Sequence, residues 1–325
     1  MAKAIRIHET GGPEVLAWDD VEVGDPRPGE ARVRHTAVGL NFIDCYFRSG
    51  TYPPPALPLV LGFEGAGVVE AVGAGVREVA PGDRVAYAAR PMGAYAEARV
   101  MPAERLVALP DDVGDVQAAA MMLQGLTVHY LLRRTFTVEP GQTILVHAAA
   151  GGVGLIACQW AKHLGATVIG TVGTTAKADA ARAHGCDHAI VTADEDFVAR
   201  VADITDGAGV PVVYDSVGRD TFAGSLDCLA PLGTMVLFGQ TSGTVEPIDP
   251  GILAAKGSLY LTRPTLFDHV ATREALAEAA AELFQVVRSG AVKIEVNQTY
   301  PLSDAASAHT DLEARRTTGS TVLLP

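Results

Sequence analysis

A run of small residues, Ala148-Ala149-Ala150-Gly151-Gly152-Val153-Gly154, is the segment of this sequence with the clearest chemical use. It follows an apolar run, residues 143–146, that is typical of a strand buried on both faces, and it precedes apolar residues at helical spacing. A backbone without large side chains approaches a pyrophosphate closely, and a helix N-terminus binds the anion. The run fits the dinucleotide fingerprint, with Ala149 at the first glycine position. A plain strand-to-helix turn is the alternative, and the strand–turn–helix–strand context favours nucleotide binding.

The strand expected at residues 167–172 bears on which nicotinamide cofactor is bound. NAD sites place Asp or Glu about 20 residues past the fingerprint. Here no acidic residue occurs before Asp179, whereas Thr174, Thr175 and Lys177 suit a 2′-phosphate. The alternative is that Lys177 is a solvated first-turn residue of the next helix. The sequence favours NADPH over NADH.

The charge and cysteine content exclude several classes of partner. The formal net charge is −13, which disfavours nucleic acid and anionic lipid as partners. The four cysteines have no paired spacing and fit a reducing compartment. No signal peptide and no stretch long enough to span a bilayer is visible. We therefore expect a cytoplasmic protein that does not bind membranes.

The pattern of elements changes twice along the chain. Residues 1–123 read as short strands broken by Gly and Pro turns, which predicts a β-rich domain. Residues 124–262 alternate apolar strands with helical patterns, which predicts an α/β domain with a parallel, doubly wound sheet. Residues 263–325 hold a long helix and then strand, helix and strand. Because this tail is small, we expect it to pack on the first domain, so that the Rossmann domain is an insertion.

Ordered motifs across nearly the whole chain resemble the zeta-crystallin-like quinone oxidoreductases, which are zinc-free members of the medium-chain dehydrogenase/reductase superfamily. The segments that carry the resemblance are residues 11–16 (GGPEVL), 39–44 (GLNFID), 48–53 (RSGTYP), 62–69 (GFEGAGVV), 81–85 (PGDRV), 125–127 (GLT), 147–154 (HAAAGGVG), 214–218 (YDSVG), 238–239 (FG) and 262–264 (TRP). The resemblance implies a GroES-like catalytic domain built from both ends of the chain, an inserted Rossmann domain that binds NADPH, and a homodimer joined through the Rossmann domains near residues 258–261.

The same resemblance implies an acceptor pocket at Asn41, Tyr46 and Tyr52. Asn41 would donate an amide hydrogen bond to the acceptor or hold the nicotinamide, and the phenols would stack on a ring or act as a general acid. Tyr52 could instead only anchor the proline turn at residues 53–55. Cys45 could be a reactive thiol or, more commonly, a small buried hydrophobe.

The cofactor residues implied by the resemblance lie mostly in the middle of the chain. They are Asn41, Thr127, Gly151, Gly152, Val153, Gly173, Thr174, Lys177, Thr192, Ser216, Phe238, Gly239, Thr241, Ser242, Gly243, Arg263 and Arg315. Thr192 stands where the family pattern has a Tyr beside the adenine phosphate. Arg315 could compensate, and its alternative is a solvated helix end.

Zinc is not expected. Asn41 and Phe63 stand where zinc-dependent relatives carry Cys and His, and the scattered cysteines cannot form a zinc lobe. Without a Lewis acid, an acceptor must already be electrophilic, which suits a quinone or, as the alternative, an enone or alkenal double bond. Some relatives serve as structural lens proteins or bind RNA. The negative charge argues against RNA binding, and a structural role leaves the intact nucleotide loop unexplained.

Overall fold

The computed structural model describes residues 1–325 and divides into two compact units. One unit comprises 1–126, 270–284 and 294–325, and the other comprises 127–269 and 285–293. The sequence placed the boundaries at 123 and 262, and it did not foresee that 285–293 groups with the second unit. No helix is both long and apolar enough to cross a membrane.

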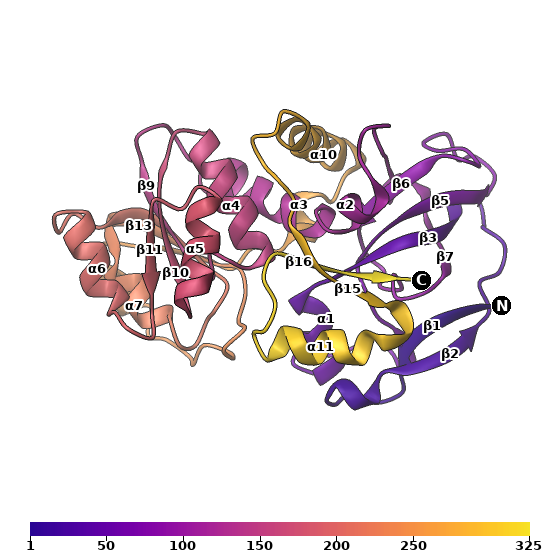
Figure 1. The fold of residues 1–325 in the computed structure, drawn as a ribbon, viewed down its shortest axis with the longest axis horizontal. Helices are drawn as coiled ribbons and strands as arrows, with labels where there is room; N and C mark the ends of the chain where they lie inside the picture. Colours follow the sequence, from indigo (N-terminus) through magenta and orange to yellow (C-terminus); the bar gives the residue numbers. More distant parts are fainter. The chain divides into compact units, whose positions relative to one another are not determined.

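A six-stranded parallel sheet forms the centre of the second unit (Figure 1). Its strands are β9 (Thr143–Val146), β10 (Thr167–Val172), β11 (His188–Val191), β12 (Val210–Asp215), β13 (Leu229–Leu237) and β14 (Tyr260–Thr262). Their order is β11-β10-β9-β12-β13-β14. This is the doubly wound order of a Rossmann fold, whose direction reverses between β9 and β12. The predicted α/β class is confirmed.

Helices connect the parallel strands of this sheet, because a parallel pair needs a crossover. They are α4 (Gly152–His163), α5 (Thr175–Ala183), α6 (Phe197–Ile204) and α7 (Phe222–Asp227), with the shorter α8 (Gly251–Ala255) and α9 (Leu266–His269) further along. Helix α4 packs on β9 and β10, and α7 packs on β12 and β13. Leu145, Ile169, Val213 and Met235 are fully buried members of the core that these elements share. Strands buried on both faces read as continuous apolar runs, which explains the agreement for β9 and β10.

The first unit is mainly antiparallel β-structure. Its strands are β1 (Ala2–Ile7), β2 (Ala17–Val21), β3 (Glu30–Leu40), β4 (Leu59–Val60), β5 (Glu64–Val72), β6 (Arg84–Ala88), β7 (Ala98–Pro102), β8 (Val107–Ala108), β15 (Val296–Pro301) and β16 (Ser320–Leu324). One sheet has the order β2-β1-β4 and the other β15-β16-β3-β5-β6-β8, with β7 paired to β3. Three helices accompany them: α1 (Phe42–Ser49), α2 (Asp115–Ala119) and α11 (Ala305–Glu313).

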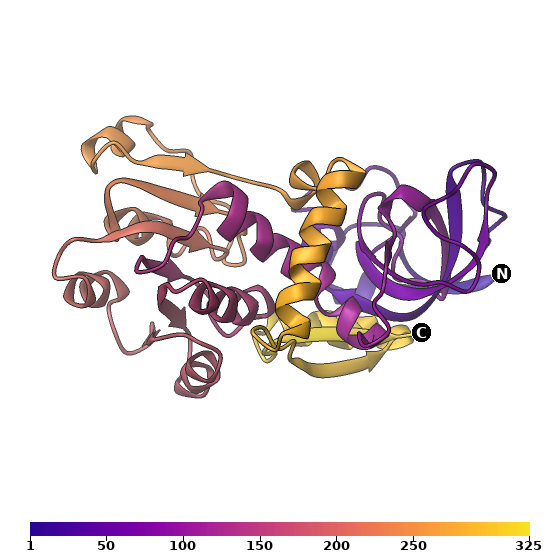
Figure 2. The same ribbon diagram turned by 90° about the horizontal axis from the view of Figure 1, so that it is seen from above.

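The two ends of the chain meet in the larger sheet of the first unit. Strand β16 pairs antiparallel with β3, with Val322 opposite Gly39. Two of the four boundaries between the units fall inside helices, namely α3 (Met122–Tyr130) and α10 (Arg273–Arg288), and Figure 2 shows α10 as one continuous helix. Helix α10 is the long helix expected after residue 263, and its Leu276 and Leu283 side chains are buried.

Candidate active site

The cofactor residues expected in the second unit follow the carboxyl ends of its parallel strands. Gly151, Gly152 and Val153 come after β9, Gly173, Thr174 and Lys177 after β10, Thr192 after β11, Ser216 after β12, Phe238, Gly239, Thr241, Ser242 and Gly243 after β13, and Arg263 after β14. Since the carboxyl ends of parallel strands share one edge of a sheet, the fold collects these segments there. Ligands of open α/β sheets bind at this edge, beside the strands where the order reverses.

The loop between β9 and α4 is shaped by small residues. Helix α4 has Gly151 as its N-cap, and no side chain caps its first N–H groups. A Cβ built on Gly154 would be 2.3 Å from the carbonyl oxygen of Ala148, so the helix lies directly on the loop. The Ala149 N–H donates to the carbonyl oxygen of Thr171 over 3.0 Å. Uncapped N–H groups beside small side chains form a cradle that suits a pyrophosphate.

Hydroxyl groups mark the ends of the next two strands. Thr174 caps α5, and its Oγ1 accepts the N–H of Lys177 over 3.3 Å. The Thr174 hydroxyl hydrogen remains available to a phosphate oxygen, because a hydroxyl both accepts and donates. Thr192 donates its hydroxyl and its N–H to the carbonyl of Val172, over 3.2 and 2.9 Å. Thr192 is therefore fixed to the end of β10.

The segments after β12 and β13 are joined by short contacts. The Thr241 N–H donates to Ser216 over 3.1 Å, and the Ser242 N–H donates to Val217 over 2.8 Å. A Cβ on Gly239 would be 2.6 Å from the Ser216 carbonyl oxygen, so no larger residue fits. Arg263 donates to the carbonyl of Gly239 over 2.9 Å, and also to Leu237 over 3.0 Å and to Gln240 over 3.1 Å. Arg263 thus links the end of β14 to the loop that follows β13.

Besides Asn41, two expected cofactor residues lie apart from these segments in the chain. Thr127 is buried within α3. Arg315 belongs to the first unit, follows α11, is exposed and has a φ of 58°. Their roles toward a cofactor stay predictions.

The expected acceptor residues gather at α1 in the first unit. Asn41 is the N-cap of this helix and is 6% exposed. The Tyr46 and Tyr52 rings are 5.1 Å apart in an edge-to-face arrangement, and the Tyr52 N–H donates to the Tyr46 carbonyl over 3.0 Å. Phe47 packs on Tyr52 and on Phe63, with ring centroids 5.6 and 5.5 Å apart. The two tyrosines thus form part of an aromatic cluster, with Tyr46 and Tyr52 partly exposed.

A buried polar network around Asn41 escaped the sequence analysis. Asn41 Nδ2 donates to Glu64 Oε2 over 2.6 Å, and Asn41 Oδ1 accepts from Gln124 Nε2 over 3.2 Å. Ser320 donates to Gln124 Oε1 over 2.7 Å, and Glu64 Oε1 accepts the N–H of Leu123 over 2.8 Å. Burial raises the pKa of Glu64 to about 8, although hydrogen bonds to the carboxylate oppose the shift. The available signal was an acidic residue at the start of β5, directly before the small residues Gly65, Ala66 and Gly67.

A second buried network holds α1 to α11. Asp44 Oδ2 accepts the Asn41 N–H over 2.9 Å and the Tyr95 hydroxyl over 3.1 Å, while His309 Nε2 lies 3.0 Å from that hydroxyl. Burial raises the pKa of Asp44 to about 7 and lowers that of His309 to about 3. Cys45 is buried beside them, and its pKa is raised by burial. A buried thiol of raised pKa is a poor nucleophile, which favours the packing interpretation of Cys45.

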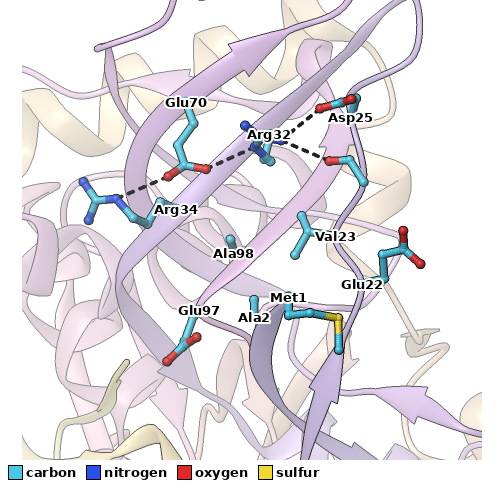
Figure 3. A pocket seen from close by; sticks show the side chains of 11 residues that line it. Met1, Ala2, Glu22, Val23, Asp25, Arg32, Arg34, Glu70, Glu97 and Ala98 are labelled. Carbon is cyan, nitrogen blue, oxygen red and sulfur yellow. Dashed lines mark hydrogen bonds and ion pairs between the residues drawn. The ribbon is translucent and has the colours of Figure 1, made fainter.

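A surface pocket of about 470 Å³ lies elsewhere in the first unit (Figure 3). Arg32 contacts Asp25 and Glu70 in it, each over 3.1 Å, and Arg34 lies 3.5 Å from Glu70. None of the expected site residues lines this pocket. Both of its arginines are paired with its own carboxylates, and we do not count it as part of the candidate active site.

Comparison with protein families gives the class. Residues 27–111 match the alcohol dehydrogenase GroES-like domain, and residues 152–284 match the zinc-binding dehydrogenase family. A quinone oxidoreductase of Pseudomonas aeruginosa is 56% identical over 325 residues, with both chains fully covered. A 2-haloacrylate reductase of Burkholderia is 47% identical, covering 100% of this chain and 99% of that one.

A solved structure agrees with both matches. The Escherichia coli quinone oxidoreductase complexed with NADPH has a TM-score of 0.98 and 52% identity, with both chains fully covered. The chain therefore belongs to the quinone oxidoreductases of this dehydrogenase family. The resemblance predicted from the ordered motifs is confirmed.

Proposed function

We propose that this enzyme reduces quinones with NADPH, without zinc. The observation that carries the proposal is the uncapped loop between β9 and α4, at the switch point of a Rossmann sheet. Membership of the quinone oxidoreductases supports it, as does the NADPH complex of a relative that is 52% identical. When bound, NADPH supplies the hydride.

The second unit provides the groups that would hold the cofactor. The N–H groups at the start of α4 would bind the two linked phosphates, and Gly154 lets helix and loop approach each other. Thr174 and Lys177 carry a hydroxyl and an ammonium group to the end of β10, where a 2′-phosphate needs donors and positive charge. The structure thus fits the phosphate groups of NADPH at two places.

The first unit provides the groups that would receive the acceptor. Asn41 Nδ2 has a second hydrogen beyond the one given to Glu64, and it can donate to an acceptor oxygen. The partly exposed rings of Tyr46 and Tyr52 offer a surface for a planar ring and a phenol that can pass on a proton.

The donor set around Asn41 does not suit zinc. Its amide is held by Glu64 and Gln124, and the neighbouring Phe63 ring packs on Phe47. No group of three or more His, Cys, Asp or Glu side chains is arranged to hold a metal ion. Tetrahedral zinc needs converging imidazole, thiolate or carboxylate ligands, so we derive no step through zinc.

The test is NADPH oxidation by purified protein against benzoquinone and naphthoquinone, with metal content measured on the same sample. We expect turnover well above the uncatalysed rate and no stoichiometric metal. Asn41→Ala should lower kcat/KM for the quinone by about a hundredfold, because a lost donor to developing charge costs that much. Turnover at the uncatalysed rate would refute the proposal.

Reduction of an activated double bond is the second candidate. The 47% identical 2-haloacrylate reductase favours it, because this name describes reduction of an activated alkene. The hydride chemistry is the same, and only the electrophile differs. Parallel kcat/KM measurements with naphthoquinone, an enone and 2-chloroacrylate decide between the two acceptor classes.

We further propose a homodimer joined through β14. This strand is the edge of the six-stranded sheet and exposes an unpaired backbone edge. Tyr260 is 62% exposed and Leu232, in the adjacent strand, is 64% exposed. Sedimentation velocity should give a dimer, and Tyr260→Arg should shift it toward the monomer. A monomeric wild type would contradict this proposal.

A further inference from the structure

A buried chain of side chains runs beneath the carboxyl ends of β9, β10 and β12 in the second unit. His147, immediately after β9, has Nδ1 at 2.7 Å from Thr171 Oγ1 and Nε2 at 2.9 Å from Ser225 Oγ. Ser225 Oγ donates to Asp215 Oδ2 over 2.9 Å. Each of these side chains is at most 3% exposed. The chain therefore links two strands, the loop after β9 and helix α7, without water.

The direction of the hydrogen bonds is fixed by the carboxylate at one end. Asp215 can only accept, so the Ser225 hydroxyl hydrogen is committed to it. Ser225 Oγ then accepts from His147 Nε2–H, and the bare Nδ1 accepts from the Thr171 hydroxyl. These contacts fit the neutral tautomer of His147 that carries its proton on Nε2. Burial also lowers its pKa, although the nearby Asp215 charge opposes the shift.

Asp215 extends the chain to the loops on the other side of the switch point. Its Oδ1 accepts the N–H groups of Val217 and Gly218 over 2.7 and 3.0 Å, which shapes the turn after β12. Thr221 donates to Oδ2 over 2.7 Å. The segment after β13 is hydrogen-bonded to the same turn. The Ser242 hydroxyl and N–H both donate to the carbonyl oxygen of Val217, each over 2.8 Å.

We propose that Thr171, His147, Ser225 and Asp215 are positioning residues that hold the dinucleotide-binding loops as one unit. None of the four needs to touch the cofactor. His147 directly precedes the cradle at residues 148–151, and the Thr171 carbonyl accepts the Ala149 N–H of that cradle over 3.0 Å. Backbone donors bind an anion well only if their positions are set before it arrives. This inference rests on the proposed binding of NADPH.

If the four residues have this role, breaking the chain should lower the affinity for a dinucleotide whether or not the dinucleotide carries a 2′-phosphate. The chain acts on the backbone that faces the pyrophosphate, which NADPH and NADH share. Breaking it should therefore weaken both dinucleotides by the same factor, whereas Lys177→Ala should weaken NADPH alone. A residue that served only general stability would change neither affinity.

The test is calorimetric titration of wild type and variants with NADPH and with NADH. Ser225→Ala removes the central link, and Leu226→Ala is the matched control, because Leu226 is the next residue of α7 and is buried in the sheet core. We expect Ser225→Ala to raise both dissociation constants by roughly tenfold, since it leaves two buried partners unsatisfied. Leu226→Ala should lower the unfolding temperature and leave both constants unchanged, and the KM for naphthoquinone should change in neither variant.

Thr171→Val removes the hydrogen bond at the other end of the chain with a residue of the same shape. If Ser225→Ala does not fold, the dissociation constants of Thr171→Val test the inference instead. Binding by Ser225→Ala or Thr171→Val that equals the wild type overturns the inference and leaves the proposed function standing. A loss confined to NADPH, or an equal loss in Leu226→Ala, also overturns it. A wild type that binds neither dinucleotide refutes the proposed function and this inference together.

Discussion

The buried carboxylates of the two units are held in opposite ways. Asp215, in the second unit, accepts four hydrogen bonds from two N–H groups and two hydroxyls. In the first unit, Asp44 keeps one buried oxygen without a hydrogen-bond partner, and Glu64 lies in a site where burial raises its pKa to about 8. Asp215 is thus fully hydrogen-bonded, whereas burial raises the pKa of both Glu64 and Asp44.

This difference separates a rigid region from a titratable one. The dinucleotide-binding unit needs unchanging backbone positions, and a satisfied carboxylate supplies them. The region around Asn41 carries Glu64 and Asp44 with pKa values of about 8 and about 7, both in contact with Asn41. The protonation state around Asn41 therefore changes near neutral pH, whereas the loops of the other unit are held by neutral donors.

Replacing Gly154 should break the rigid region with the largest effect. In Gly154→Ala the new Cβ would lie 2.3 to 2.7 Å from backbone atoms of Ala148 and Ala149, which cannot rotate away. We expect a loss of about 3 kcal/mol in the free energy of unfolding and no measurable NADPH binding. Urea unfolding measures the free energy of unfolding, and calorimetry measures NADPH binding. Gly114→Ala is the control, because a Cβ there meets nothing within 4 Å.

Glu64→Gln should reduce the pH dependence of the free energy of unfolding. The folded state raises the pKa of Glu64 from 4.5 to about 8, so it binds the proton more tightly than the unfolded chain does. Its contribution is complete below pH 4.5 and is lost as the pH rises through about 8. The free energy of unfolding of the wild type should therefore fall across this range, and that of the variant should fall less. Equal slopes in urea titrations would contradict the assignment.

Lys177→Ala should change only the proposed contact with the 2′-phosphate and leave the buried network around Asp215 intact. The dissociation constant for NADPH should rise roughly tenfold, because a charge-assisted bond to the 2′-phosphate is lost. That for NADH should change little. Equal changes for both dinucleotides would place Lys177 outside the 2′-phosphate site.

The smallest effect is expected at Cys45. Its thiol is 2% exposed and its pKa is raised by burial, so iodoacetamide should not modify it in the native protein. Mass spectrometry after alkylation, with and without urea, checks this. Rapid native modification with loss of quinone reduction would restore the reactive-thiol interpretation.

The features that were predicted best from the sequence are those that depend on local backbone structure. The strands β9 and β10 were expected at the residues where they lie, and the nucleotide loop follows β9 because a close backbone approach demands small residues. The Asn41 network could not be foreseen. Its partners Glu64 and Gln124 are 23 and 83 residues away along the chain, and only the folded sheet brings them together.

Similarly, the hydrogen-bond partners of His147 could not be foreseen from the sequence. Thr171 and Ser225 lie 24 and 78 residues further along the chain. Local spacing carries no information about such pairs, because side-chain networks depend on which strand ends become neighbours.

The central proposal is that the backbone loop after β9 holds NADPH and that Asn41 donates a hydrogen bond to the acceptor. Single-turnover mixing of the NADPH complex with naphthoquinone tests it most directly, with binding and absorbance followed separately. We predict that Asn41→Ala binds NADPH as the wild type does and consumes it about a hundredfold more slowly. An Asn41→Ala variant that turns over at the wild-type rate would contradict the account, as would a wild type that binds NADPH and never oxidises it.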